Sequence, residues 1–272
     1  MASDPAPSTV RRIGSDWEAL AQSDPLWAVL TQPDRKGNRW DPDEFFATGR
    51  GEIDTLWQTL ERLDRLPDAV PDEAGRLLGA LDFGCGVGRL SQALALRFER
   101  VVGVDISPTM IEQARAFANR LGPPADRCDF RVGPSDRVEV PGDERFAFAY
   151  SNIVFQHMPW SMASGYIGAI AERLAPGGLF AFQIPVAEHP PADGPAWKRA
   201  ARTVLPEPAK RAIRRVRCGA DVARMRMVAT PEPVVRARLD ACGLRDVAVA
   251  DWPMTGERFD SRLFVARRPP GL

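Results

Sequence analysis

Short apolar runs alternate with amphipathic stretches through the middle of the sequence. The apolar runs predict strands at 77–81, 100–105, 129–132, 145–150 and 179–184. Helical spacing follows the first run at 89–98, a capped helix start at Ser107-Pro108 follows the second, and a helix with Ile167, Ile170 and Leu174 precedes the turn Pro176-Gly177-Gly178. This alternation predicts an α/β fold with a mainly parallel sheet and right-handed crossovers.

The same pattern continues in a simpler form near the end of the chain. Thr230-Pro231 predicts the start of a helix that Gly243 ends. The stretches 246–250 and 262–266 then predict two strands joined by a hairpin-like connection.

The N-terminal part has a helical pattern of its own. Residues 1–14 are small, polar and proline-containing, which predicts a disordered tail. Helix starts are expected at Ser15 with Glu18, at Asp24-Pro25 and at Asp41-Pro42, with a break at Gly49 before an amphipathic segment that packs on the core. The aromatic residues of 15–75 have two interpretations, an attachment of the helices to the sheet or a lid over a ligand.

Positive charge gathers in an insertion at about 188–229, after the fifth predicted strand. It holds ten lysines and arginines, namely Lys198, Arg199, Arg202, Lys210, Arg211, Arg214, Arg215, Arg217, Arg224 and Arg226. Three interpretations remain: the solvated face of one or two helices, a cap that attracts an anionic small molecule, or a nucleic-acid surface.

Composition narrows the class of protein. The 272 residues include 44% hydrophobic ones, enough for one substantial core with appendages. The formal net charge of +0 argues against a protein whose whole surface binds nucleic acid. The four cysteines are far apart and lack C-x-x-C spacing, so free thiols and no metal site are expected. No leader pattern or membrane-length apolar run is visible, which predicts a cytoplasmic protein without a membrane partner. The oligomeric state is not readable.

The candidate chemistry begins at the end of the first predicted strand. Asp82-Phe83-Gly84-Cys85-Gly86-Val87-Gly88 follows the pattern D-x-G-x-G-x-G, in which glycines let the backbone turn and approach a ligand at a helix N-terminus. The second predicted strand ends in Asp105, whose carboxylate can accept from both hydroxyls of a ribose. The two features together predict a nucleotide-type site.

With these motifs the chain resembles the class I S-adenosylmethionine-dependent methyltransferases, in particular the bacterial small-molecule type. The resemblance covers about 76–187 and 230–268, including Ile106–Met110, Tyr150–His157 and Leu174–Gly178. It implies a Rossmann-like, doubly wound, mainly parallel seven-stranded sheet with an antiparallel final strand. It also implies a domain at 76–272, an N-terminal helical lid at 15–75 and a helical cap formed by the insertion.

The resemblance further implies S-adenosylmethionine as cofactor and suggests where it binds. The expected cofactor residues are Asp82, Gly84, Cys85, Gly86, Gly88, Asp105, Ile106, Met110, Ser135, Ser151 and Asn152, with Phe46 and Arg50 from the lid. In this scheme Phe46 contacts the adenosine or methionine part and Arg50 binds the carboxylate. Asp136 is a further candidate for adenine recognition, with turn formation as its alternative role.

Proton removal from an acceptor would call for a base, and the chain has two histidines, His157 and His189. Both follow predicted strands at the ligand-binding edge, so both are candidate catalytic residues, with a structural role as the alternative. Ser151-Asn152-Ile153-Val154 stands where methyltransferases of base amino groups carry Asn or Asp before Pro-Pro and an aromatic residue. Methylation of a base amino group is therefore not expected, and the resemblance to the bacterial small-molecule type implies transfer to a small molecule at an oxygen. The alternatives are an RNA methyltransferase that uses the basic insertion and a non-catalytic cofactor-binding protein.

Overall fold

One mixed sheet organises the protein, and its order follows a doubly wound pattern. The computed structural model describes residues 6–68, 79–189, 225, 227–252 and 258–270. Its seven strands lie in the order β3-β2-β1-β4-β5-β7-β6, and β7 runs antiparallel to both β5 and β6. The strands are β1 (Ala80–Phe83), β2 (Val101–Asp105), β3 (Cys128–Val132), β4 (Phe146–Ser151), β5 (Leu174–Glu188), β6 (Arg245–Asp251) and β7 (Phe259–Arg267). The predicted fold class, including the antiparallel final strand, is confirmed.

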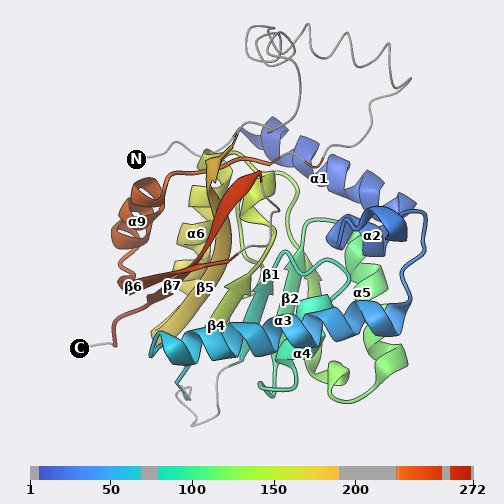
Figure 1. Ribbon diagram of the computed structural model, residues 1–272, viewed down its shortest axis with the longest axis horizontal. Coiled ribbons are helices and arrows are strands. Elements are labelled where there is room, and N and C mark those ends of the chain that lie inside the picture. The colour runs from blue at the N-terminus through green and yellow to red at the C-terminus, as the bar shows by residue number, and fades with distance from the viewer. Residues whose placement is uncertain (1–5, 69–78, 190–224, 226, 253–257, 271–272) are drawn as a thin grey trace, which may run out of the picture.

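Helices cover both faces of this sheet (Figure 1). On one face α3 (Pro42–Arg62) and α4 (Arg89–Leu94) share a core cluster with alternate residues of the central strands, such as Phe148 and Leu179. On the other face α6 (Trp160–Arg173) and α9 (Glu232–Ala241) pack with Phe180, Phe182 and Phe264. Successive strand residues therefore point into different cores, as the period of two requires.

Helix α5 (Pro108–Leu121) follows β2, and its start matches the predicted cap. Ser107 is the N-cap residue, and its hydroxyl oxygen accepts from the backbone N–H of Met110 at 3.1 Å. Two single turns complete this region, η2 (Ala125–Arg127) before β3 and η3 (Phe155–His157) after β4.

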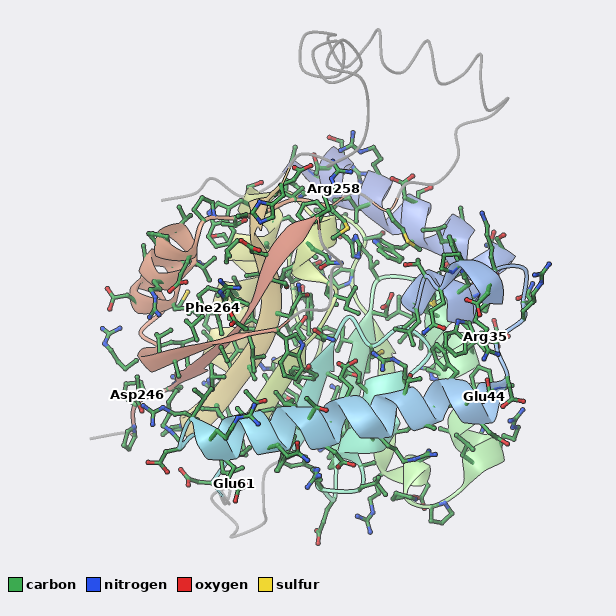
Figure 2. All side chains as sticks on the ribbon, viewed as in Figure 1. Arg35, Glu44, Glu61, Asp246, Arg258 and Phe264 are labelled. Atoms are coloured by element: carbon green, nitrogen blue, oxygen red, sulfur yellow. The ribbon has the colours of Figure 1, made fainter. Side chains whose placement is uncertain are left out.

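The N-terminal helices are α1 (Pro7–Ser23) and α2 (Pro25–Val29), followed by the turn η1 (Pro33–Arg35). The prediction of a disordered tail at 1–14 was wrong for 7–14, because α1 begins at Pro7 and buries Val10 and Ile13. The capping box expected at Ser15 does not form, since Ser15 lies inside α1. In Figure 2, Arg35 of η1 and Glu44 of α3, which form an ion pair of 2.9 Å, connect this region to the sheet-covering helix.

Helix α3 runs without the break expected at Gly49. A Cβ atom at Gly49 would lie 2.4 Å from the carbonyl oxygen of Arg89, so the glycine allows α3 and α4 to touch instead of ending a helix. The turn expected at 176–178 likewise lies inside β5, which begins at Leu174, and Gly177 has a φ of 81° there.

The connection from β3 to β4, residues 133–145, forms no helix. Its Val138 and Val140 belong to the core cluster that also contains Val10 and Ile13 of α1. Helix α1 thus shares a core with this connection, and it lies across the ends of the central strands (Figure 1).

The basic insertion falls largely outside the described part of the chain. Residues 190–224 and 226 are not described, so the helical cap predicted for 188–229 stays a prediction. Within the described residues, no helix combines the length and apolar character that a membrane span requires.

Candidate functional site

A cavity of about 990 Å³, its open mouth included, lies at the carboxyl ends of β1, β2 and β4. This is the edge where the direction of winding changes between β1 and β4, which is where open parallel sheets bind ligands. Helices α1, α2 and α6 complete its wall. The side chains and loops that line it come mainly from 13–29, 83–90, 104–110, 133–139 and 152–166.

The glycine loop forms the floor of this cavity. Gly84, Gly86 and Gly88 have φ values of 76°, 53° and 82°, which residues other than glycine rarely adopt. A Cβ atom at Gly84 would lie 2.3 Å from a methyl carbon of Val154. Gly84, Cys85 and Gly86 line the cavity, whereas Gly88 caps α4 and is not among the lining residues.

Asp105 is joined to this loop by its own carboxylate. One oxygen, Oδ2, accepts from the N–H of Gly86 at 2.9 Å, and the other, Oδ1, accepts from the N–H of Ser107 at 2.9 Å. Burial raises the pKa of Asp105, and the hydrogen bonds from Ser107 and Gly86 oppose that rise. Each oxygen retains acceptor capacity for a ligand hydroxyl. Ile106 and Met110 also line the cavity.

A buried charged network beside the cavity joins α3 and α4 to the end of β4. Glu52 accepts from Arg89 Nη2 at 2.7 Å and from Asn152 Nδ2 at 2.6 Å, and Tyr150 donates to it at 3.2 Å. The side chains of Arg89 and Glu52 are 3% and 7% exposed. This network fixes the positions of two polar cavity-lining residues, Arg89 and Asn152.

Two atoms of the network are buried and lack a hydrogen-bond partner, Arg89 Nε and Asn152 Oδ1. Buried polar atoms normally have partners, so this unpaired donor and this unpaired acceptor, on two residues that line the cavity, leave hydrogen-bonding capacity for a ligand that carries both functions. The amino-acid part of S-adenosylmethionine fits, because its carboxylate accepts and its ammonium group donates. The residues present therefore fit the expected cofactor, with Asp105 at the ribose.

The structure corrects the placement of two predicted cofactor residues on α3. Phe46 packs edge-to-face on Phe45 and Phe117 in a separate core cluster. Arg50 is exposed. Neither lines the cavity, and the arginine that does is Arg89.

Three further predicted residues lie near the cavity without being part of its described lining. Ser135 and Asp136 are exposed, and Asp136 pairs with Arg137. Gly133 and Glu139 line the cavity in this connection. Ser151 is fully buried, and its hydroxyl donates to the carbonyl oxygen of Phe83 at 2.9 Å, which supports β4 against β1.

The two histidines occupy different environments. His157 is buried, lines the cavity and meets the ring of Trp17 edge-on with 5.1 Å between centroids. His189 is half exposed, pairs with Asp260 at 3.0 Å and is not among the lining residues. His157 thus forms part of the cavity wall, whereas His189 lies at the surface beside the carboxylate of Asp260.

Glu52, Arg89 and Trp17 are the site residues that sequence reasoning missed. Arg89 follows the last glycine of the loop directly, and this adjacency was the available signal for a side chain near the ligand. The signal for Trp17 was its position three to four residues after Ile13 and Gly14, on the inner face of α1. Glu52 had no separate signal.

Asp82 is buried behind the loop and is not among the lining residues. It accepts from the hydroxyl of Ser91 at 2.6 Å. Burial raises the pKa of Asp82 to about 7, although the Ser91 hydrogen bond opposes the rise. Its role is therefore to support the start of α4 from below.

Asp82 gives a pH dependence of stability with a defined sign. An unfolded Asp has a pKa near 4, so between pH ~4 and ~7 the unfolded chain loses a proton that the native protein keeps, and the free energy of unfolding falls as pH rises. The free energy of unfolding of Asp82→Asn minus that of wild type should therefore rise by about 2–4 kcal/mol from pH ~4.5 to pH ~8. Urea unfolding at both pH values measures this, with exposed Asp34→Asn as control; an equal difference at both pH values would contradict the assignment.

Comparison with known proteins agrees with this geometry. Residues 80–178 match a family model described as a methyltransferase domain. The chain is 33% identical over 148 residues to a trans-aconitate 2-methyltransferase of Streptomyces coelicolor, covering 54% of this chain and 45% of that protein. It is 38% identical over 120 residues to a ribosomal protein L11 methyltransferase of Alteromonas mediterranea, covering 44% and 37%. The chain therefore spans about half or less of the length of these curated relatives.

Solved structures extend the likeness beyond the matched domain. The crystal structure of magnesium protoporphyrin IX methyltransferase from Synechocystis PCC 6803, with bound SAH, superposes with a TM-score of 0.55 at 20% identity. That superposition covers 81% of this chain and 84% of the other. At this identity the likeness concerns the fold.

Proposed function

We propose that this protein, whose residues 80–178 match a methyltransferase domain, transfers the methyl group of S-adenosylmethionine to an oxygen of a small molecule. The observation that carries the proposal is one cavity lined by Asp105, which is hydrogen-bonded to the glycine loop, and by Arg89 and Asn152, each of which has an unpaired polar atom. Groups for ribose and for amino-acid recognition are then available in one site.

The cofactor supplies the activated methyl group, and the residues of the chain supply alignment and a dry site. Asp105 would accept from the ribose hydroxyls. Arg89 would bind the carboxylate, and Asn152 Oδ1 would accept from the ammonium group. Because Glu52 neutralises Arg89, the pair can stay buried before the cofactor arrives.

The remaining lining favours an acceptor with a large apolar part. Ile13, Trp17, Met158, Met162 and Tyr166 form most of this wall, and Glu139, its acidic member, pairs with Arg137. A protonated amine would be stabilised by free carboxylates, and the described lining offers only Asp105 and the paired Glu139. This supports oxygen over nitrogen as the acceptor atom. An anionic acceptor would depend on the arginines of the insertion for its counter-charge.

We also propose that α1 acts as a lid and the insertion as a cap. Glu18 of α1 accepts from the hydroxyl of Ser107 at 2.6 Å and from the hydroxyl of Thr109 at 2.5 Å, which ties α1 to the start of α5. The chain returns from the insertion at Val228, whose N–H donates to the carbonyl oxygen of Gln156 at 2.8 Å. Both segments thus meet elements that form the cavity.

The lid proposal predicts that Glu18→Ala exposes α1. Burial tends to raise the pKa of Glu18, but the hydrogen bonds from Ser107 and Thr109 outweigh it and the pKa is lowered, so the carboxylate is ionised at neutral pH. Losing these bonds should speed tryptic cleavage after Arg11 and Arg12 by about 2- to 10-fold. Exposed Glu61→Ala is the control, and an unchanged cleavage rate would contradict the lid.

The function itself is tested by binding and by methyl transfer. Calorimetry of the intact protein should show S-adenosylmethionine binding, and its absence would overturn the proposal. Titration with RNA over a salt series separates the competing activity, because tight binding with a steep loss as salt rises would favour an RNA substrate. Incubation with ribosomal protein and radiolabelled cofactor tests a protein acceptor in the same way.

A further inference from the structure

A row of buried polar side chains connects the sheet centre to His157. Gln183 lies in the middle of β5 and is 0% exposed, and Gln156 and Ser261 are 3% exposed. Buried polar side chains are costly unless their hydrogen bonds are satisfied. These residues bond to one another in a chain that reaches the histidine ring, and a fixed donor at its start sets the direction of each bond.

The chain has a fixed starting point in the backbone. The N–H of Ile153, which can only donate, lies 3.0 Å from Gln183 Oε1, so this oxygen must accept. Ile153 has a φ of 60°, an unusual value for a β-branched residue, and it lines the cavity. Gln183 therefore also supports a strained turn at the ligand site.

The orientation of Gln183 sets that of Gln156. With its oxygen facing Ile153, the amide nitrogen of Gln183 donates to Gln156 Oε1 at 3.1 Å and to the hydroxyl of Ser261. Both N–H bonds of that amide are thereby used. The opposite orientation of Gln156 would place two amide nitrogens against each other, so Gln156 must present its own nitrogen to the other side.

That nitrogen lies 3.2 Å from His157 Nε2. Since an amide nitrogen only donates, His157 Nε2 must accept and must be unprotonated. We propose that Gln183 and Gln156 are positioning residues that hold His157 as the neutral tautomer with its proton on Nδ1, so that its Nε2 lone pair is not available as a general base.

The consequence for methyl transfer rests on the proposed function. Proton removal by His157 Nε2 would first require the Gln156 hydrogen bond to break. Of the other ionisable lining residues, Asp105 is bound to the glycine loop and Glu139 is paired with Arg137. Tyr166 has a pKa raised to about 12 by burial, so it is a poor candidate for a base near neutral pH. Within the described lining, the arrangement favours an acceptor whose hydroxyl ionises readily, such as a phenol or a carboxylic acid.

The tautomer can be read directly because the chain has two histidines. In His189→Gln protein labelled with ¹⁵N-histidine, His157 is the remaining signal. Long-range ¹H–¹⁵N spectra of this protein at neutral pH should show Nε2 as the unprotonated nitrogen and Nδ1 as the protonated one. A protonated Nε2 in this protein would overturn the proposal.

Gln156→Glu, made in the same protein, tests the direction of the chain. Gln183 would still donate to one carboxylate oxygen, and the other oxygen would require a proton on Nε2, so the Nε2 signal should change to the protonated type. Exposed Gln58→Glu on α3 adds the same charge elsewhere and should leave the spectrum unchanged. An unchanged spectrum in folded Gln156→Glu protein would overturn the proposal.

A second variant covers the case in which Gln156→Glu fails to fold. Gln183→Met removes the fixed orientation while keeping the side chain's length, so both tautomers of His157 should become populated. A single Nδ1–H form in this variant would overturn the role of Gln183. These spectra need no cofactor, so a protein that failed to bind S-adenosylmethionine would contradict the proposed function and leave this result intact.

Discussion

Asp105→Ala is expected to weaken S-adenosylmethionine binding by about 1–3 kcal/mol, or roughly 5- to 150-fold in Kd. The carboxylate would accept from two ribose hydroxyls, and an alanine side chain can accept from neither. The loss should appear in calorimetry as a higher Kd with an unchanged stoichiometry of one.

Asp105 also accepts from the backbone of Gly86 and Ser107, so the variant can disturb the loop as well as the ligand. Asp105→Asn keeps one acceptor oxygen and should bind with intermediate affinity. Exposed Asp34→Ala is the matched control for loss of a carboxylate. If Asp105→Ala melted like wild type and bound the cofactor equally well, the assignment of Asp105 to the ribose would be wrong.

The sequence predicted the central units of the fold because two signals coincide there. At 80–88 an apolar strand runs into glycines whose positive φ values the structure requires. At Ser107-Pro108 a capping side chain and a fixed φ define the first turn of α5. Each of these features is local, so a single sequence carries enough information to place it.

Features that depend on contacts between distant segments were not readable. The break expected at Gly49 followed from glycine's low helix propensity, whereas the structure uses Gly49 for contact with Arg89, forty residues later in the chain. The start of α1 was missed because residues 7–14 offer only Val10 and Ile13 as buried apolar side chains. Both are buried in a core cluster with residues far along the chain, such as Val140 in the connection from β3 to β4.

The misplacement of Arg50 has a geometric cause. The buried stripe of α3 includes Phe46, Ile53 and Leu60, and Arg50 and Glu52 lie on opposite flanks of that stripe. Helical periodicity treats the two flanks alike. Only the packing of α3 on α4 shows that Glu52 faces the cavity network and that Arg50 faces solvent.

Glu52, on the flank of α3 that faces α4, is expected to have a large effect on stability. Glu52→Leu is expected to lower the free energy of unfolding by about 3–5 kcal/mol, because it leaves the charge of Arg89 buried without a partner. Asn152 and Tyr150 lose their acceptor in the same step. Urea unfolding of the protein without cofactor measures the loss.

The double variant Glu52→Leu/Arg89→Met decides whether the buried charge is the cause. Removing both partners leaves no uncompensated ion, so the double variant should regain most of the stability that Glu52→Leu loses. It should still fail to bind S-adenosylmethionine tightly, since Arg89 would be the ligand for the carboxylate. Glu61→Leu, an exposed change on the same helix (Figure 2), should shift stability by no more than about 0.5 kcal/mol. A double variant as unstable as Glu52→Leu alone would show that α3 depends on Glu52 for packing and not for charge balance.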